Sequence, residues 1–495
     1  MRAASARELQ WGRAASLVLV VVCATACALG RLLDLASWLP RDRNEGWNAL
    51  LAVRAQQGEA LYWDAHALVA NNYPPLSFEL LGKLGALLAV DELLLGRVVA
   101  LLALIGSAFA VFAIARALGA SRGAAAFAGA FLIAEIAANH ASYVAMNDPQ
   151  WLGHALQLAG LVVLVRRPAA RGALVAMVLA MVLGLMTKHT LVVLPVAATF
   201  WQVRKRPSAG RLVAAVASCA VLGALALLQL RYGAKLWQGL LLARGYSVHD
   251  ALRSGSRQAL YLAPVVIACW RARARAGDGV NGTAAAAARI AELAWPYFVL
   301  ALSCGVVLLG GDGVDSNAMF DAVIAASLLA AVVYEAAPRA WVVAGMLLVV
   351  CIATPLRVRS ELERHAAAPP MLERTREAVA ALRAIPGDAA CWELALCHRA
   401  HKAFVFDAWS VRERQASGAL PRDAFAQALA AGRFAAVQVP VGLFGLSREE
   451  ETALSLRYRR GRVFVGVGEI WVRVGRSAEP PVAFSGRPVD SVGDR

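Results

Sequence analysis

Three short polar stretches carry residues that could do chemistry, and long apolar segments separate them in the chain. They are RDRNEGWNAL (residues 41–50), MNDPQ (146–150) and TKHT (187–190). Their charged members include Glu45, Asp148 and Lys188. A carboxylate can act as a general base towards a hydroxyl group, and a lysine can balance an anion such as phosphate. The three stretches are therefore candidates for one acid–base and anion-binding site.

The first stretch concentrates its polar groups on one helical turn. Asn44, Glu45 and Asn48 are spaced within a turn, and Trp47 could anchor that helix at a membrane interface. Glu45 is the candidate base, and the competing interpretation is an ordinary solvated loop acid. The segment NNYPPLSF (residues 71–78) follows further along and adds Tyr73.

In the second stretch Asp148 precedes Pro149, and this order is typical of a capped helix start. The functional interpretation is a second acid that faces Glu45. Two such carboxylates could share a hard divalent cation such as Mg²⁺ or Mn²⁺.

The third stretch places Lys188 and His189 at the end of the apolar segment GALVAMVLAMVLGLMT. A lysine there can simply extend its ammonium group to the interface. Further basic residues are expected on the same side, where the positive-inside trend predicts few of them. They would suit an anionic lipid phosphate, and they are Arg231, Lys235, Arg244, His249, Arg253 and Arg257.

The composition indicates what must position these residues. The chain has 495 residues, of which 59% are hydrophobic and only 17% are charged, and its mean hydropathy is +0.56. This pattern is typical of a polytopic membrane protein. The net charge of +16 comes from basic residues scattered between apolar runs, so a nucleic-acid-binding role is disfavoured.

The apolar runs predict a bundle of about 11 transmembrane helices, since each crossing needs about 20 apolar residues. The first run resembles a signal peptide, but its length favours an uncleaved helix. The segment 76–90 is expected to lie on the membrane surface as an amphipathic helix, because it carries Glu79 and Lys83. The expected spans are centred near residues 23, 105, 133, 158, 179, 197, 220, 264, 301, 327 and 347.

With the N-terminus inside, the clustered arginines fall on the cytoplasmic side. The long first loop (residues 34–92) and the C-terminal region then lie outside. The fold class is mainly α: residues 1–355 form the transmembrane domain, residues 356–478 a small α/β domain, and residues 479–495 a disordered tail. HKAFVFDAW (401–409), FAAVQVPV (434–441) and GRVFVGVGEIWVRV (461–474) are expected to include its strands.

Cys391 and Cys397 are the cysteines of this polar C-terminal region, and the other six lie in apolar spans. A disulfide between them would fit an extracytoplasmic location. Two buried free thiols are an equal alternative.

The order of these motifs resembles that of the GT-C class of membrane glycosyltransferases. It is most similar to the bacterial family that uses polyprenyl-phosphate sugars, which includes aminoarabinose and protein mannosyl transferases. The similarity rests on NEGWNA, on Tyr73-Pro74-Pro75-Leu76, on Asp148 and on Lys188. The acid pair of that family is Asp-Glu, whereas this chain has Asn44-Glu45, with Asp42 as the next nearest acid.

The resemblance implies an integral-membrane glycosyltransferase that moves a hexose or pentose from a polyprenyl phosphate to an acceptor hydroxyl in an inverting single displacement. Glu45 would be the base, with Asn44 and Asp148 beside it. Lys188, His189, Arg244 and Arg253 would bind the donor phosphate, and Trp47, Asn48 and Tyr73 would contact the acceptor. Glu45 and Asp148 are also the residues that could hold a divalent cation.

The resemblance also implies a location in the bacterial inner membrane, with the site on the periplasmic side. The acceptor would be a glycan, lipid or protein of the cell envelope. A transporter or flippase is the main rival; it would predict charged residues at mid-membrane. A non-catalytic relative is the third possibility, since Asn44 replaces an acid.

Overall fold

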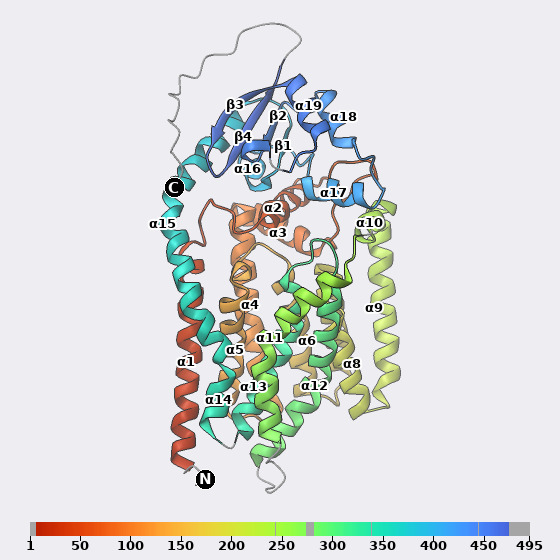
Figure 1. The fold of residues 1–495 in the computed structure, drawn as a ribbon. Helices are drawn as coiled ribbons and strands as arrows, with labels where there is room; N and C mark the ends of the chain where they lie inside the picture. The colour runs from red at the N-terminus through yellow and green to blue at the C-terminus, as the bar shows by residue number, and fades with distance from the viewer. Residues whose placement is uncertain (1–5, 243, 274–281, 338, 444, 475–495) are drawn as a thin grey trace.

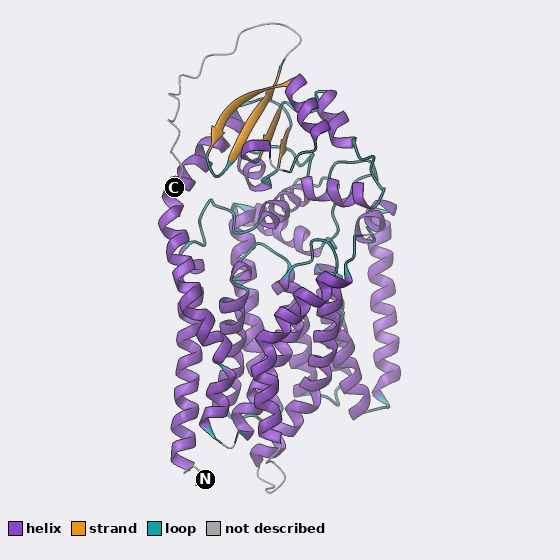
Figure 2. Cartoon of the chain, in the orientation of Figure 1, coloured by secondary structure: helices purple, strands orange, loops and turns teal. Residues whose placement is uncertain are grey.

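The computed structural model describes residues 6–242, 244–273, 282–337, 339–443 and 445–474. It has two parts, which are a bundle of long helices and a small mixed sheet with short helices at one end of the bundle (Figure 1, Figure 2). The N-terminus lies at the opposite end of the bundle from the sheet.

The bundle is built around α13 (Phe320–Ala336), in which every residue from Phe320 to Glu335 is buried. At the edge of the bundle stands α9 (Ala209–Tyr232), whose most apolar window is only 11% buried. The other helices of the bundle are α1 (Ala6–Leu33), α4 (Glu92–Ala117), α5 (Arg122–Asn139), α6 (Gln150–Arg166), α7 (Arg171–Thr187), α8 (Val193–Lys205), α11 (Val248–Arg273), α12 (Gly282–Leu308), α14 (Ala340–Met346) and α15 (Leu348–Ala384).

Five described helices are long and apolar enough to cross a membrane, or six if the bent pair α14–α15 counts as one span. The sequence predicts about 11 spans. Ten of the expected centres fall inside helices, and the eleventh falls at the joint between α14 and α15. The counts differ because several bundle helices are short: α6 and α7 have 17 residues each and α8 has 13.

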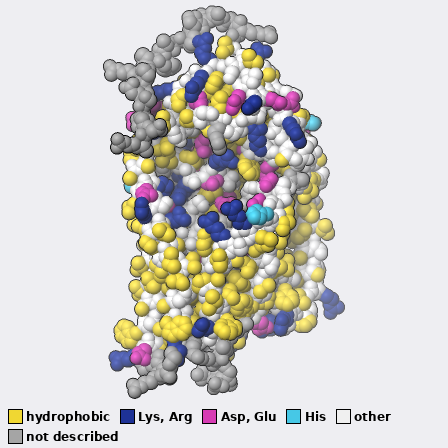
Figure 3. All heavy atoms as spheres, in the orientation of Figure 1, with side chains coloured by type: hydrophobic (Ala, Val, Ile, Leu, Met, Phe, Trp, Pro, Cys, Tyr) yellow, Lys and Arg dark blue, Asp and Glu magenta, His cyan; other side chains and the backbone are white. Residues whose placement is uncertain are grey.

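The surface of the bundle has the distribution that a membrane requires. Hydrophobic side chains dominate the middle of the face in Figure 3, and charged side chains gather near its two ends. Around the bundle as a whole, many large apolar side chains are exposed, among them Phe109, Leu227 and Trp270. Water would not favour such a surface, but hydrocarbon would.

Short helices lie between the bundle and the sheet and carry the polar stretches. Asp42 caps α2 (Arg43–Gln56) by accepting a hydrogen bond from the Asn44 amide. The expected surface helix is α3 (Leu76–Leu88), which packs against α2. The remaining short elements are η1 (Ala141–Tyr143), α10 (Ala234–Leu240) and η3 (Ser316–Met319).

The C-terminal part contains a four-stranded sheet of order β1-β2-β4-β3. β1 pairs in parallel with β2, with Ala389 opposite Ala436, and the other pairs are antiparallel. Its strands are β1 (Ala389–Cys391), β2 (Ala436–Val439), β3 (Tyr458–Phe464) and β4 (Gly468–Arg473), and its helical elements are α16 (Leu394–Arg399), α17 (Ala408–Ala416), α18 (Ala424–Ala430), η4 (Val441–Leu443) and α19 (Arg448–Arg457).

Four expectations for this region have different outcomes in the structure. The boundary expected near residue 355 falls inside the continuous helix α15, so a single helix joins the two parts. No strand forms in residues 401–409, because Phe404 and Phe406 are buried from a loop and Asp407 caps α17. Cys391 and Cys397 form a disulfide, and the expected disordered tail 479–495 lies outside the described residues.

Close packing joins the two parts at α2. A side chain on Gly46 would place its Cβ 2.2 Å from the backbone nitrogen of Ala395 in α16. The backbones of α2 and α16 can approach this closely only because Gly46 has no side chain.

We predict that the two ends of α7 lie on opposite sides of the membrane. In a background without the six free cysteines, His189→Cys should react with an impermeant maleimide added outside the cells. Arg171→Cys should react only after permeabilisation. Both positions are exposed at opposite ends of α7. Labelling of both from the same side would contradict this arrangement.

Candidate active site at the junction of the two parts

Glu45 and Arg97 form a fully buried ion pair at the end of the bundle that adjoins the C-terminal part. Both side chains are 0% exposed, and the guanidinium holds the carboxylate in two hydrogen bonds of 2.8 Å and 2.6 Å. The Glu45 carboxylate also accepts hydrogen bonds from the backbone amides of Arg41 (2.7 Å) and Asn147 (3.0 Å). Each oxygen therefore has two donors, and Glu45 is not free to take a proton from a substrate in this conformation.

The same pair organises the loop before α2. Arg97 donates further hydrogen bonds to the carbonyl oxygens of Leu35, Ser37 and Leu39, at 3.1, 2.6 and 2.8 Å. A planar guanidinium with five donors suits this task. The loop between α1 and α2 is thereby tied to α4.

The turn that carries Asp148 is attached to α2 through its neighbour Asn147. The Asn48 amide donates to the Asn147 carbonyl (2.8 Å), and the Asn147 side chain donates to the Glu45 carbonyl (3.2 Å). Asn147 fits because Gly96 of α4 lacks a side chain: a Cβ there would lie 1.9 Å from Oδ1 of Asn147. The sequence predicts that Asn48 contacts an acceptor. In the structure its side-chain amide links α2 to the turn that carries Asp148.

Asp148, Lys188 and Tyr73 lie close together in the structure. Nζ of Lys188 lies 3.6 Å from Oδ1 of Asp148 and 4.8 Å from the centre of the Tyr73 ring. Burial lowers the pKa of Lys188, but the Asp148 carboxylate and Tyr73 raise it by more, so its pKa lies above the ordinary value. Lys188 is thus a buried ammonium group that is paired with the Asp148 carboxylate and packed on the Tyr73 ring.

A cavity of about 270 Å³ opens beside this cluster, between the bundle and the C-terminal part. Arg244 reaches it from the loop before α11, where its Nε lies 3.5 Å from Oε1 of Glu413 in α17. Both parts of the chain therefore supply its wall. The lining residues are Asp42, Arg43, Asn44, Trp47, Asn72, Tyr73, Arg244, Gly313, Asp315, Trp392, Leu394, Asp407, Ala408, Trp409 and Ser410.

Asp42 is the carboxylate of the first loop that faces this cavity. Burial raises its pKa above the ordinary value of 3.8, and the nearby carboxylates Asp315, Asp148 and Glu45 act in the same direction. A carboxylate with a raised pKa and access to a polar cavity has the properties of a general base.

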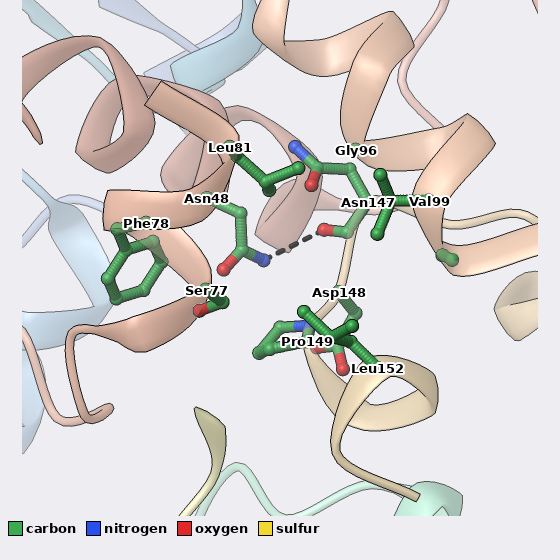
Figure 4. Close-up of a pocket in the computed structure, with 11 residues that line it drawn as sticks. Asn48, Ser77, Phe78, Leu81, Gly96, Val99, Asn147, Asp148, Pro149 and Leu152 are labelled. Carbon is green, nitrogen blue, oxygen red and sulfur yellow. Dashed lines mark hydrogen bonds between the residues drawn. The ribbon is translucent and has the colours of Figure 1, made fainter. Parts of the chain in front are cut away.

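A second, much smaller cavity of about 10 Å³ lies beneath the Asp148 turn. Figure 4 shows Asn48, Ser77 and Asp148 around it, with apolar neighbours such as Leu81 and Val99. Its volume is about that needed for one water molecule, so a sugar or a phosphate would not fit there.

The remaining predicted residues divide into buried and exposed groups. Trp47 is buried, with its ring 5.2 Å from that of Tyr73 and 5.7 Å from that of Phe78, so it supports the cavity floor and does not lie at a surface. His189 and Arg253 are exposed, and neither lines the cavity. Asn44 is exposed and does line it.

The pair Glu45 and Asp148 does not fit a metal ion. The Arg97 guanidinium and two backbone amides occupy both Glu45 oxygens. The Lys188 ammonium group already balances the Asp148 carboxylate. Within the described residues, the group of possible metal ligands is Asp91, Glu92 and His398, which lies apart from the cavity lining. Nη1 of Arg399 approaches the Asp91 carboxylate to 2.9 Å there, so the group also forms an ion-pair network.

Several residues of the site were not predicted from the sequence. Arg97 is the one that the sequence could have indicated most clearly, because it lies in an apolar segment where a charge is costly unless it is paired. Asp315 caps η3, Trp392 lies in the loop after β1 and Trp409 lies in the first turn of α17, and only the folded chain brings them to the cavity.

Comparison with known proteins gives the fold but no close relative. No family model matches the chain, and no curated protein matches it. Among solved structures, ArnT from Cupriavidus metallidurans bound to undecaprenyl phosphate matches with a TM-score of 0.60 and 14% sequence identity, over 94% of this chain and 99% of that one. An archaeal oligosaccharyltransferase from Archaeoglobus fulgidus matches with a TM-score of 0.43 and 12% identity, over 81% and 65%.

The chain therefore has a polytopic membrane fold similar to that of ArnT. The resemblance to GT-C class membrane glycosyltransferases that the sequence motifs suggested is confirmed at the level of the fold. At 14% identity the likeness does not carry over an activity.

We predict that Glu45→Gln destabilises the protein strongly, because it leaves the Arg97 guanidinium buried without a counter-ion. Breaking a buried pair costs about 3–5 kcal/mol in unfolding free energy. Thermal or denaturant unfolding in detergent measures this loss.

Glu59→Gln is the matched control. Its pair with Arg54 is partly exposed, since the Glu59 side chain is 47% exposed, and an exposed pair is worth roughly 1 kcal/mol or less. Equal effects of the two variants would contradict the structural role of the Glu45–Arg97 pair.

Proposed function

We propose that the protein is an integral-membrane glycosyltransferase that moves a sugar from a polyprenyl phosphate to an acceptor hydroxyl in the cavity between its two parts. The observation that carries this proposal is the buried, charged Lys188 beside a polar cavity at the outer end of an apolar bundle. The ArnT structure of similar fold has undecaprenyl phosphate bound, which supports a lipid-phosphate donor.

The donor phosphate is proposed to bind between Lys188 and Arg244. Close to hydrocarbon a phosphate charge is costly unless it is balanced. Lys188 offers a buried ammonium group beside Tyr73 of the cavity lining, and Arg244 lines the cavity, with Glu413 beside it. His189 and Arg253 are left out of this role because both are exposed, whereas Lys188 is buried against Tyr73 of the cavity lining.

The base is proposed to be Asp42, with Glu45 as the residue that positions it. Asp42 takes the proton of the acceptor hydroxyl while the hydroxyl oxygen attacks the anomeric carbon of the sugar. The bond between that carbon and the phosphate oxygen breaks, and the polyprenyl phosphate leaves with the electron pair. Inversion follows from this single displacement. Lys188 and Arg244 stabilise the charge that develops on the leaving phosphate.

No step of this mechanism passes through a metal ion. Glu45 has no oxygen free for Mg²⁺ or Mn²⁺, and the Lys188 ammonium group competes with a cation for Asp148.

The membrane arrangement proposed for this function has 11 spans, with the C-terminal α/β part on the periplasmic side of a bacterial inner membrane. The Cys391–Cys397 disulfide supports this side, because disulfides persist in oxidising compartments. The short helices α6, α7 and α8 would cross together with their flanking turns. The donor would enter sideways from the bilayer, and the acceptor would come from the cell envelope.

Turnover of donor tests the function directly. Purified protein in proteoliposomes is offered a panel of undecaprenyl-phosphate sugars (mannose, glucose, arabinose and aminoarabinose), and released undecaprenyl phosphate is measured. We expect one donor to be consumed, and Lys188→Met to lower its kcat/KM at least about 100-fold, because the leaving phosphate loses a buried counter-charge.

Lys83→Met is the control for this variant, since Lys83 is 78% exposed on α3, and it should leave turnover unchanged. Absence of turnover with every donor, or equal loss in both variants, would contradict the proposal.

Asp42→Asn should reduce transfer by at least about 100-fold while the melting temperature stays close to that of the wild type. The base must be deprotonated, so the rate should fall as the pH drops through the raised pKa of Asp42. Asp315→Asn removes a carboxylate that raises this pKa, and we expect it to shift the acidic limb of the pH–rate profile to lower pH. A profile that is unchanged in Asp315→Asn, or transfer that persists in Asp42→Asn, would assign the base to another residue.

A further inference from the structure

We propose that the wall which the C-terminal part contributes to the cavity is a saccharide subsite, so that the acceptor is a glycan and not a peptide or an acyl chain. The inference rests on the proposed function, in which transfer takes place in this cavity. It starts from the two tryptophans of that wall, Trp392 and Trp409.

Trp409 is an exposed aromatic ring in a polar cavity. It is 40% exposed, whereas Phe406, Phe425 and Phe434 in the core of the same part are at most 1% exposed. Its ring packs on Gly313, where a Cβ would lie 2.2 Å from the ring, and the Arg43 guanidinium lies 5.7 Å from the ring centre. The ring thus projects from α17 onto the bundle at the cavity wall and stays partly exposed.

Trp392 is the second ring, and it is fixed from behind. Its centre lies 5.4 Å from that of Phe406 and 5.8 Å from that of Phe425. It follows Cys391, whose disulfide to Cys397 closes the short loop that carries it. A fixed aromatic ring loses little conformational entropy when a ligand packs against it.

The polar groups opposite these rings suit hydroxyl groups. Asn44 and Asn72 line the cavity, and neither side-chain amide takes part in a hydrogen bond among the described residues. Arg43 stands beside Trp409, and its charge also acts on the nearby carboxylates of Asp407 and Glu393. A sugar ring has an apolar face of C–H bonds and an edge of hydroxyls, so it can stack on an aromatic ring while its edge binds amides and guanidinium groups.

Other acceptor classes fit the wall less well. An acyl chain needs a continuous apolar surface, but carboxylates (Asp42, Asp315, Asp407) and arginines (Arg43, Arg244) line this cavity. An extended peptide usually binds along a free strand edge, and no lining residue belongs to one of the described strands.

The test uses full-length protein in nanodiscs on an array of bacterial envelope oligosaccharides, with unmodified peptides and phosphatidylglycerol vesicles as parallel probes. We expect the wild type to retain oligosaccharides. Trp409→Ala should weaken their binding roughly tenfold, and Trp409→Phe by less than about threefold. Trp270→Ala is the matched control, since Trp270 is 68% exposed on α11, and it should bind like the wild type.

Asn72→Ala provides a second variant that leaves the aromatic packing of the wall intact, and we expect several-fold weaker oligosaccharide binding. Preferential retention of peptides or vesicles, or oligosaccharide binding equal in wild type, Trp409→Ala and Asn72→Ala, would overturn the subsite.

This failure differs from failure of the proposed function. The function fails if the wild type consumes none of the undecaprenyl-phosphate sugars. The subsite fails if donor is consumed while glycan binding does not depend on Trp409.

Discussion

The buried ion pair between Glu45 and Arg97 is the interaction that fixes the loops at the end of the bundle next to the C-terminal part. A fully buried arginine is tolerated only when every donor has a partner, and Arg97 finds its partners in Glu45 and in three carbonyl groups of the loop before α2. Glu45 in turn accepts from the turn that carries Asp148. Two polar stretches about a hundred residues apart in sequence are thereby fixed to one helix.

This ion pair gives Glu45 a structural role and leaves Asp42 as the carboxylate of the first loop that faces the cavity. Glu45 is buried to hold the scaffold, whereas Asp42, three residues earlier, caps the same helix and faces the cavity. Burial raises the pKa of Asp42 and the carboxylates around it act in the same direction, and Lys188 balances Asp148 nearby. Acidic and basic groups can coexist at the edge of an apolar bundle because each has a defined partner.

The C-terminal part completes the site and does not merely cover it. Close contact between Gly46 and Ala395 brings α16 onto α2, and Arg244 meets Glu413 across the cavity. The aromatic side chains of the wall are held by the core of the C-terminal part and by Gly313 of the bundle. The shape of the cavity therefore depends on how the two parts dock.

The sequence by itself determined the features that come from local composition and order. Apolar runs and basic clusters indicated a membrane bundle and the positions of most of its helices, and strand-like runs indicated the regions of β2 and of the β3–β4 pair. The order of the motifs indicated one site for Glu45, Asp148 and Lys188. The sequence could not determine which carboxylate is free, since Glu45 and Asp42 look alike until Arg97 is paired with one of them. Nor could it show that AFVFDAW is a loop and a helix cap, because long-range packing of Phe404 and Phe406 overrides their local preference for a strand. The tertiary structure decided these points because burial and ion pairing depend on contacts between residues far apart in the chain.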